Sequence, residues 1–157
     1  MEFEKALDRM KRYCAYQDRC HLEVSRKLYD IGIYGDDKDQ VMAELIEQNF
    51  LNEERFAKSF ARGKFRMKKW GRNKILNGLQ ERQISDYCIR KGLKEIEEDE
   101  YIRVLKEILI SQIRKYNGEN ALIAKDKAIK YASKRGYEAP IIFAIVKEIE
   151  LDSDSFL

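Results

Sequence analysis

Apolar residues recur at helical spacing along almost the whole chain, and this periodicity constrains the fold more than any other feature. The 157 residues include a single proline, and residues that favour helix dominate the composition. We find no segment with the alternating pattern of a strand. The sequence therefore predicts an all-α fold with helices at 3–16, 19–31, 37–49, 53–69, 72–83, 86–96, 99–116, 120–135 and 139–150.

The segments between these helices indicate an internal repeat. Equivalent positions recur at offsets of 51 and then 53 residues, as in the series Leu28, Leu79 and Ala132. The segment 84–96 aligns without gaps with 137–149, and both end in Lys-Glu-Ile. Three helices are too few to enclose a large core, but stacked neighbours bury the remaining apolar faces. We therefore predict three tandem three-helix repeats at 1–50, 51–97 and 98–151, followed by a frayed tail at 152–157.

Positive charge is concentrated in the second predicted repeat. That repeat has a net charge of +7, whereas the first has −3 and the third, with its tail, has −1. The stretch from Arg62 to Lys74 carries seven positive charges, and no acid lies between Glu54 and Glu81. Because crowded like charges without i,i+4 partners repel, this pattern favours an anionic partner surface over a merely solvated face.

A helix over 53–69 separates apolar from basic side chains. Its predicted core stripe consists of Phe56, Phe60, Gly63 and Met67. Phe65 falls beside the basic face, away from this stripe. Trp70, the only tryptophan, marks the turn into the next helix, either packed between helices or available for stacking. The predicted partner-binding surface consists of Arg55, Lys58, Arg62, Arg66, Lys69, Arg72 and Lys74.

No motif for catalysis, a cofactor or a metal ion is present. The chain lacks a phosphate-binding loop, a metalloprotease motif and a nucleophile elbow. His21 is the only imidazole, and three cysteines at irregular spacing form neither a disulfide framework nor a zinc site. The acidic run 95–100 reads as the start of a helix. We predict no enzymatic activity, no cofactor and no metal, with free thiols at Cys14, Cys20 and Cys88.

The termini and hydropathy suggest a soluble, cytoplasmic protein. The first residues include acids and no apolar stretch typical of a signal peptide. The longest apolar run, 139–146, is too short for a bilayer span of about 20 residues. We therefore expect no membrane partner.

Three motifs, in order along the chain, resemble the RecX family of modulators of the RecA recombinase. They are DRCHLEVSRKLYDIGI (18–33), FLNEERFAKSFARGKFRMKKWGRNKILNGLQERQIS (50–85) and AIKYASKRGYEAPIIFAIV (128–146). The central motif is similar to the family's acidic L-[DN]-[DE]-E-R-F-A signature and the basic helix after it. The motifs are spread over most of the chain, from residue 18 to residue 146, in a form similar to Bacteroidetes-type members.

The resemblance implies an elongated, curved array of three repeats without enzymatic activity. It also implies binding in the groove of the RecA filament on single-stranded DNA, with lower ATPase and strand exchange. A monomer is expected. The chain departs from the family at Cys20, where serine or threonine is common, so the cap of that helix is expected to pass to Asp18. At the usual acidic pair, Asn52 still provides a cap.

Two other functions fit the same residues. A direct, sequence-tolerant nucleic-acid binder would track phosphates with its basic face and stack bases on Phe65 and Trp70. A purely structural helical adaptor would leave that face solvated. Binding to bare single-stranded DNA, with and without recombinase, separates the three functions.

Overall fold

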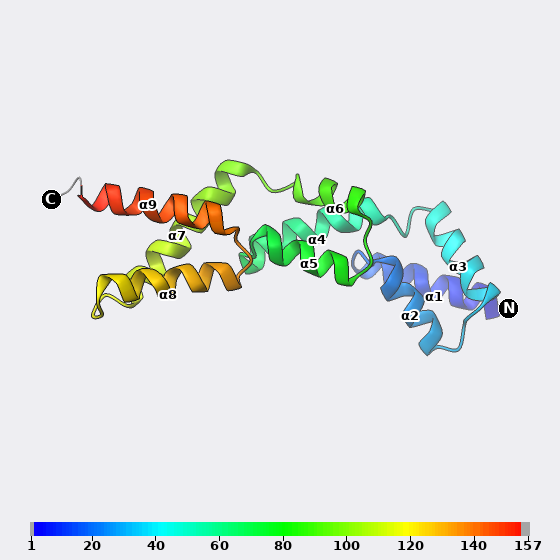
Figure 1. Cartoon of the computed structure of the whole chain (residues 1–157). Helices are drawn as coiled ribbons and strands as arrows, with labels where there is room; N and C mark the ends of the chain where they lie inside the picture. The colour runs from blue at the N-terminus through cyan, green and yellow to red at the C-terminus, as the bar shows by residue number, and fades with distance from the viewer. Residues whose placement is uncertain (1, 155–157) are drawn as a thin grey trace. The chain divides into compact units, whose positions relative to one another are not determined.

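The computed structural model describes residues 2–154, which form nine α-helices and no strand (Figure 1). The prediction of an all-α fold is confirmed, and every predicted helix is present with ends shifted by a few residues. The helices are α1 (Glu2–Tyr16), α2 (His21–Asp30), α3 (Asp36–Glu47), α4 (Glu53–Lys68), α5 (Arg72–Glu81), α6 (Asp86–Leu93), α7 (Glu98–Lys115), α8 (Ala121–Lys134) and α9 (Ala139–Asp154).

Polar residues start several helices as the sequence predicts. The side chain of Asn52 accepts a hydrogen bond from the backbone N–H of Arg55 at 2.9 Å, which caps α4. At the start of α7, the Glu97 carboxylate accepts hydrogen bonds from the backbone N–H groups of Asp99 and Glu100. The acidic run therefore serves as a helix start.

The start of α2 differs from the expectation. Cys20 occupies the N-cap position without a side-chain hydrogen bond to the backbone, and its Sγ instead lies 3.3 Å from the Glu23 carboxylate. Asp18 does not take over the cap. Its carboxylate accepts from Nε of Arg55 at 3.1 Å, because a guanidinium is a stronger partner than a backbone N–H.

The described chain divides into two compact units. The first contains the residues up to Phe60 together with Gly78–Gly92, and the second contains Ala61–Asn77 and the residues from Leu93 onward. The boundaries pass through α4 and α5, so the middle predicted repeat contributes to both units. The division into three repeats stays a prediction.

The first unit has its core where α1, α2 and α3 pack together. The buried residues of this cluster are Ala6, Met10, Cys14, Val24, Leu28, Val41, Leu45 and Leu51. In the same unit, α6 lies close to α4, because a Cβ at Gly92 would be 2.7 Å from the carbonyl oxygen of Ala57. Cys14 is a residue of this core.

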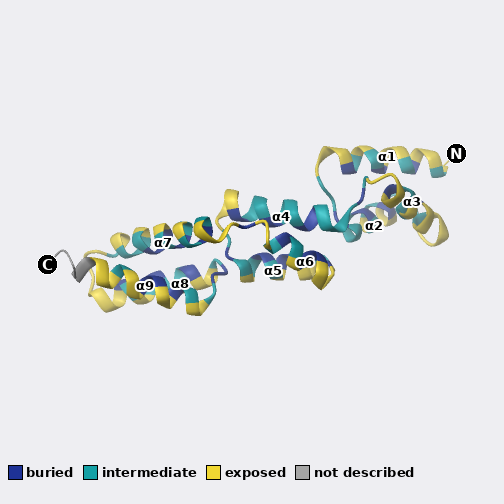
Figure 2. Cartoon of the chain, turned by 90° about the horizontal axis from the view of Figure 1, so that it is seen from above, coloured by how far each residue is buried: buried dark blue, intermediate teal, exposed yellow. Residues whose placement is uncertain are grey.

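The second unit has its core where α7 packs against α8 and α9 (Figure 2). Alanines four residues apart on α8 are buried and allow the neighbouring helices to approach closely: Ala124, Ala128 and Ala132. The ring of Tyr101 lies 5.7 Å from that of Phe65 and 5.1 Å from that of Tyr137, between centroids. The predicted frayed tail begins inside α9, and residues 155–157 lie outside the described residues.

The core face of α4 was predicted wrongly in part. Phe56 is buried as predicted, but Met67 is 85% exposed and Phe60 is only half-buried. Phe65, placed beside the basic face, is buried instead. The prediction followed the large apolar side chains, whereas small residues let neighbouring helices approach and so define the face. The buried residues of α4 are Phe56, Ala57, Ala61 and Phe65.

Candidate functional site

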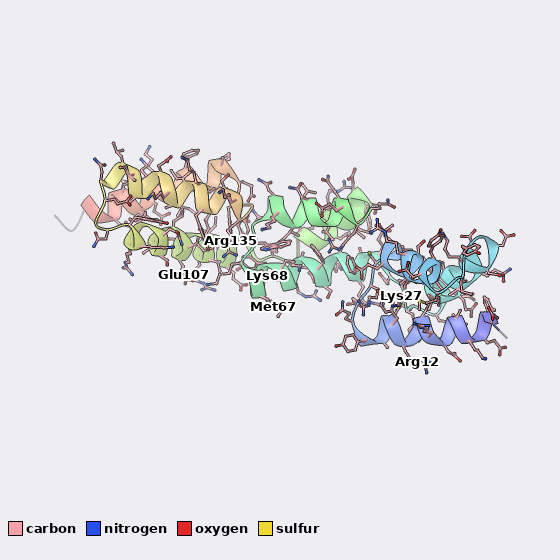
Figure 3. The ribbon with its side chains drawn as sticks, turned by 90° about the horizontal axis from the view of Figure 1, so that it is seen from below. Arg12, Lys27, Met67, Lys68, Glu107 and Arg135 are labelled. Carbon is pink, nitrogen blue, oxygen red and sulfur yellow. The ribbon has the colours of Figure 1, made fainter. Side chains whose placement is uncertain are left out.

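The basic stretch 62–74 lies entirely in the second unit, in the last turns of α4, the following turn and the start of α5. Its most accessible cations are Arg66, Lys68 and Lys69, which are all exposed. Figure 3 labels Lys68 among them. Within residues 2–154, none of these three side chains forms an ion pair. Lys68, which is not part of the surface predicted from the sequence, therefore joins Arg66 and Lys69.

Other basic residues of the stretch have internal partners. Nη1 of Arg62 lies 2.5 Å from Oε1 of Glu95, and both side chains are partly exposed. Arg72 pairs with Glu138 at 3.0 Å through Nη1 and with Glu98 through Nη2. Acidic partners at i,i+4 are missing as expected, but acids from other segments take their place: Glu98 is the first residue of α7, and Glu95 and Glu138 lie before α7 and α9.

Arg72 belongs to a partly buried polar network of the second unit. Its guanidinium lies 3.9 Å from the centroid of the Tyr101 ring, and its backbone N–H donates to the Tyr101 hydroxyl at 2.9 Å. The same hydroxyl donates to Glu138. Burial alone lowers the pKa of Arg72, but hydrogen bonds with Glu138 and Glu98 outweigh it and raise that pKa. Arg72 therefore stays charged and contributes to the fold.

The turn between α4 and α5 is bonded to the turn between α8 and α9. The N–H of Gly71 donates to the carbonyl of Arg135 at 2.8 Å, and the N–H of Asn73 donates to that of Gly136 at 2.8 Å. A Cβ on Gly71 would lie within 3.0 Å of the Gly136 backbone. These contacts hold the basic stretch at a fixed place against α8.

Carbonyl groups at the C-terminal end of α4 and just after it are satisfied by the side chains of two residues that follow α8. Nη1 of Arg135 donates to the carbonyl of Lys68 at 2.8 Å, and the Tyr137 hydroxyl donates to that of Lys69 at 2.9 Å. Such carbonyls have no partner within the helix itself. The backbone that carries Lys68 and Lys69 is therefore held from outside α4.

Trp70 is half-buried beside two lysines. The ammonium groups of Lys64 and Lys74 lie 5.0 Å and 4.7 Å from the centroid of its ring. Both distances are within the range of cation–π attraction. Of the two alternatives for Trp70, this arrangement favours packing at the turn, and it holds Lys74 against the ring.

In the first unit, Arg55 also has a structural role. Besides Asp18, its guanidinium donates to the carbonyls of Asn49 at 3.0 Å and Phe50 at 3.1 Å. Lys58 is half-buried and forms no ion pair within residues 2–154. Of the two predicted contacts in this unit, Lys58 is the more available for a partner.

Metal ligands and thiols are the remaining groups to place in the described residues. In residues 2–154 there is no cluster of three or more His, Cys, Asp or Glu side chains that could hold a metal ion. All three cysteines are buried and free. Burial raises the pKa of Cys14 and of Cys20, which keeps these thiols protonated and unreactive. No helix in the described part of the chain has the length and apolar character needed to span a bilayer.

Comparisons with known proteins agree with the motifs. Residues 52–93, which contain the whole of α4, α5 and α6, match the family model for the second three-helix domain of RecX. The chain is 26% identical over 148 residues to the regulatory protein RecX of Lactobacillus johnsonii, covering 94% of this chain and 55% of that protein. It is 28% identical over 145 residues to the RecX of Lactococcus lactis subsp. cremoris strain SK11, covering 90% and 54%.

Solved structures share the fold. A crystal structure of RecX from Lactobacillus salivarius superposes with a TM-score of 0.87 at 21% identity, covering 95% of this chain and 97% of that one. A second RecX crystal structure gives 0.83 at 19% identity, covering 92% and 71%. The chain spans about half the length of the curated relatives it matches.

Proposed function

We propose that this chain, whose resemblance to the RecX family is confirmed, regulates the RecA recombinase filament on single-stranded DNA. The curated relatives carry the name regulatory protein RecX. The proposed effect is inhibitory: the chain lies in the filament groove and lowers ATPase and strand exchange. It does so as a monomer, in the cytoplasm, and without chemistry of its own.

The observation that carries this proposal is the cluster of accessible cations within the matched segment. Arg66, Lys68 and Lys69 are exposed and form no ion pair in the described chain. Crowding them raises the electrostatic energy of the free protein, and an anionic partner lowers it again. A nucleoprotein filament offers both phosphates and carboxylates for this purpose.

The surface proposed for binding is smaller than the sequence suggested. Arg55, Arg62 and Arg72 are already paired with carboxylates, so a partner would have to compete for them. Lys74 is held at the Trp70 ring. The contacts we propose are Arg66, Lys68 and Lys69 of the second unit, with Lys58 of the first unit as a separate contact.

The runner-up function is direct, sequence-tolerant binding of nucleic acid. The residues expected to stack on bases are less accessible than the sequence suggested, because Phe65 is buried against Tyr101 and Trp70 is half-buried. Cations alone would still bind phosphates, but without the base stacking that gives single-strand binders about 1–3 kcal/mol per base. We therefore favour the filament over bare DNA as the target.

The test compares binding to a labelled single-stranded oligonucleotide with binding to the same oligonucleotide coated by recombinase. We expect tighter binding to the coated strand and a fall in recombinase ATPase. Equal or tighter binding to the bare strand would support the direct binder, and binding to neither would leave a helical adaptor.

A charge variant assigns the effect to the cluster. Arg66→Gln combined with Lys68→Gln should weaken filament binding about tenfold, since exposed ionic contacts contribute up to ~1 kcal/mol each. If both contact phosphates, the slope of log K against log salt should fall by about 1.4. The control, Lys130→Gln with Lys147→Gln, removes the same charge from exposed sites on α8 and α9. Equal losses in both variants would contradict the assignment.

A further inference from the structure

A cavity of about 350 Å³ opens in the second unit beside the end of α4. It is lined by side chains from the turn after α4, from α7, and from α8 and the residue that follows it. The polar ones are Lys69, Glu107, Ser111, Gln112, Tyr131 and Arg135. A water molecule needs roughly 10–15 Å³ of accessible volume, so there is room for a tetrahedral anion with several waters.

Arg135 brings a fixed positive charge to this cavity (Figure 3). Its Nε and Nη2 donate to the hydroxyl of Tyr131 at 3.2 Å and 2.7 Å, and its Nη1 donates to the carbonyl of Lys68 at 2.8 Å. All of these acceptors are neutral. Within residues 2–154 the guanidinium forms no ion pair. A guanidinium has five N–H donors, so two remain for a ligand.

Neighbouring side chains add neutral donors. The Tyr131 oxygen accepts both bonds from Arg135, which leaves its own O–H free to donate. Ser111 and Gln112 line the cavity from α7, and neither side chain hydrogen-bonds to another residue of the described chain. The hydroxyl of Ser111 and the amide of Gln112 can therefore turn toward a bound group.

Lys69 supplies a second cation from a fixed backbone position. It follows α4 with a positive φ of 56°, and its N–H and carbonyl are bonded to Phe65 and Tyr137. Its side chain lines the cavity without an ion pair inside the described chain. The one acid of the lining, Glu107, is bonded to Arg103 at 3.2 Å and to neither cavity cation.

We propose that this cavity binds a phosphate group through Lys69, Arg135 and the hydroxyl of Tyr131. Two unneutralised cations and several free donors around one space match an oxyanion with several acceptor oxygens. The group could belong to free phosphate or to a nucleic-acid backbone, since the chemistry is the same. The site stands on its own geometry and does not depend on the recombinase proposal.

The experiment follows backbone amide shifts by NMR during titration with inorganic phosphate at constant ionic strength. We expect saturable shifts at the cavity residues. Lys69→Gln should weaken phosphate binding about fivefold or more, since it removes one charge-assisted contact. Glutamine suits this backbone, because Gln83 has a φ of 59° in the same protein. Ser111→Ala, a second variant outside the helix-end contacts, should weaken binding by a smaller factor.

The control is Lys134→Gln, which removes an exposed charge next to Arg135 without altering the cavity lining. It should leave phosphate binding within twofold of the parent. A short oligothymidylate is then titrated onto the same variants. If Lys69→Gln weakens the binding of both inorganic phosphate and the oligothymidylate, the cavity binds a backbone phosphate. If it weakens the binding of inorganic phosphate alone, the cavity binds a free phosphate group. An absence of saturable shifts, or equal weakening by Lys134→Gln, would overturn the proposal.

Discussion

Replacing Arg72 with glutamine should lower the free energy of unfolding by about 3 kcal/mol. The Arg72–Glu138 pair contributes most, about 2 kcal/mol, because its side chains are only 21% and 23% exposed. Glu98 is 63% exposed, so that pair adds ~0.5 kcal/mol or less. Loss of the guanidinium from the Tyr101 ring at 3.9 Å costs about 1 kcal/mol more. Glutamine keeps the helix propensity, so the loss reports the side-chain contacts.

Urea unfolding measures this loss by circular dichroism and by the emission of Trp70, which lies in the same unit as Arg72. The matched control is Arg66→Gln, which removes the same charge from an exposed, unpaired position of that unit. It should change stability by no more than about 0.5 kcal/mol. Glu138→Gln completes a double-mutant cycle with Arg72→Gln.

An Arg72→Gln variant as stable as the parent would refute the reasoning. Arg72 would then be free to serve a partner, as the sequence alone suggested. If the variant is destabilised but folded, its binding to recombinase filaments should keep the salt dependence of the parent.

Three further outcomes follow from burial. Phe65→Ala should lower the free energy of unfolding by about 3–5 kcal/mol, measured in urea, because the side chain is only 3% exposed. Met67→Ala should lower it by less than ~0.5 kcal/mol, because Met67 is exposed. Similar losses in the two variants would contradict the core face of α4. Burial is the main cause that raises the pKa of Tyr101 and of Tyr137. The folded protein therefore keeps the protons of these two hydroxyls at a pH near 10, where the unfolded chain loses them. The free energy of unfolding therefore keeps its full value below about pH 10, and above that pH it falls by up to ~1.4 kcal/mol per pH unit for each tyrosine. In unfolding curves measured at several pH values, Tyr137→Phe should make this fall shallower. Thiol titration should find slow reaction in the native protein and three free thiols after unfolding without reductant, whereas a count of one would reveal a disulfide among Cys14, Cys20 and Cys88.

The helices could be predicted from sequence because their signals are local. Asn52 caps α4 and Glu97 caps α7, because each side chain accepts hydrogen bonds from backbone N–H groups only two or three residues away. Such bonds need no knowledge of the rest of the fold. The same holds for the apolar periodicity that places all the helices.

The core face and the ion pairs could not be predicted this way because they depend on distant segments. Ala61 and Phe65 are buried by neighbours that a helical wheel of α4 cannot include. Arg72 finds Glu138 66 residues away, so counting acids along α4 and α5 missed its partner. Lys68 is exposed but was left out of the predicted surface, because its neighbour Met67 was counted in the core stripe and is in fact 85% exposed.

The bonded pair of turns around Gly71 and Gly136 affects how this chain can vary. Turns usually accept substitution more readily than helices. Here a side chain at either glycine would collide with the backbone of the opposite segment, and Gly136 also has a φ of 99°. In a library of random variants selected only for folding, these two turn positions should therefore keep glycine while exposed helical positions such as Lys130 diversify. In this unit, exposed positions on the helices can therefore vary in sequence, whereas these two turn positions cannot.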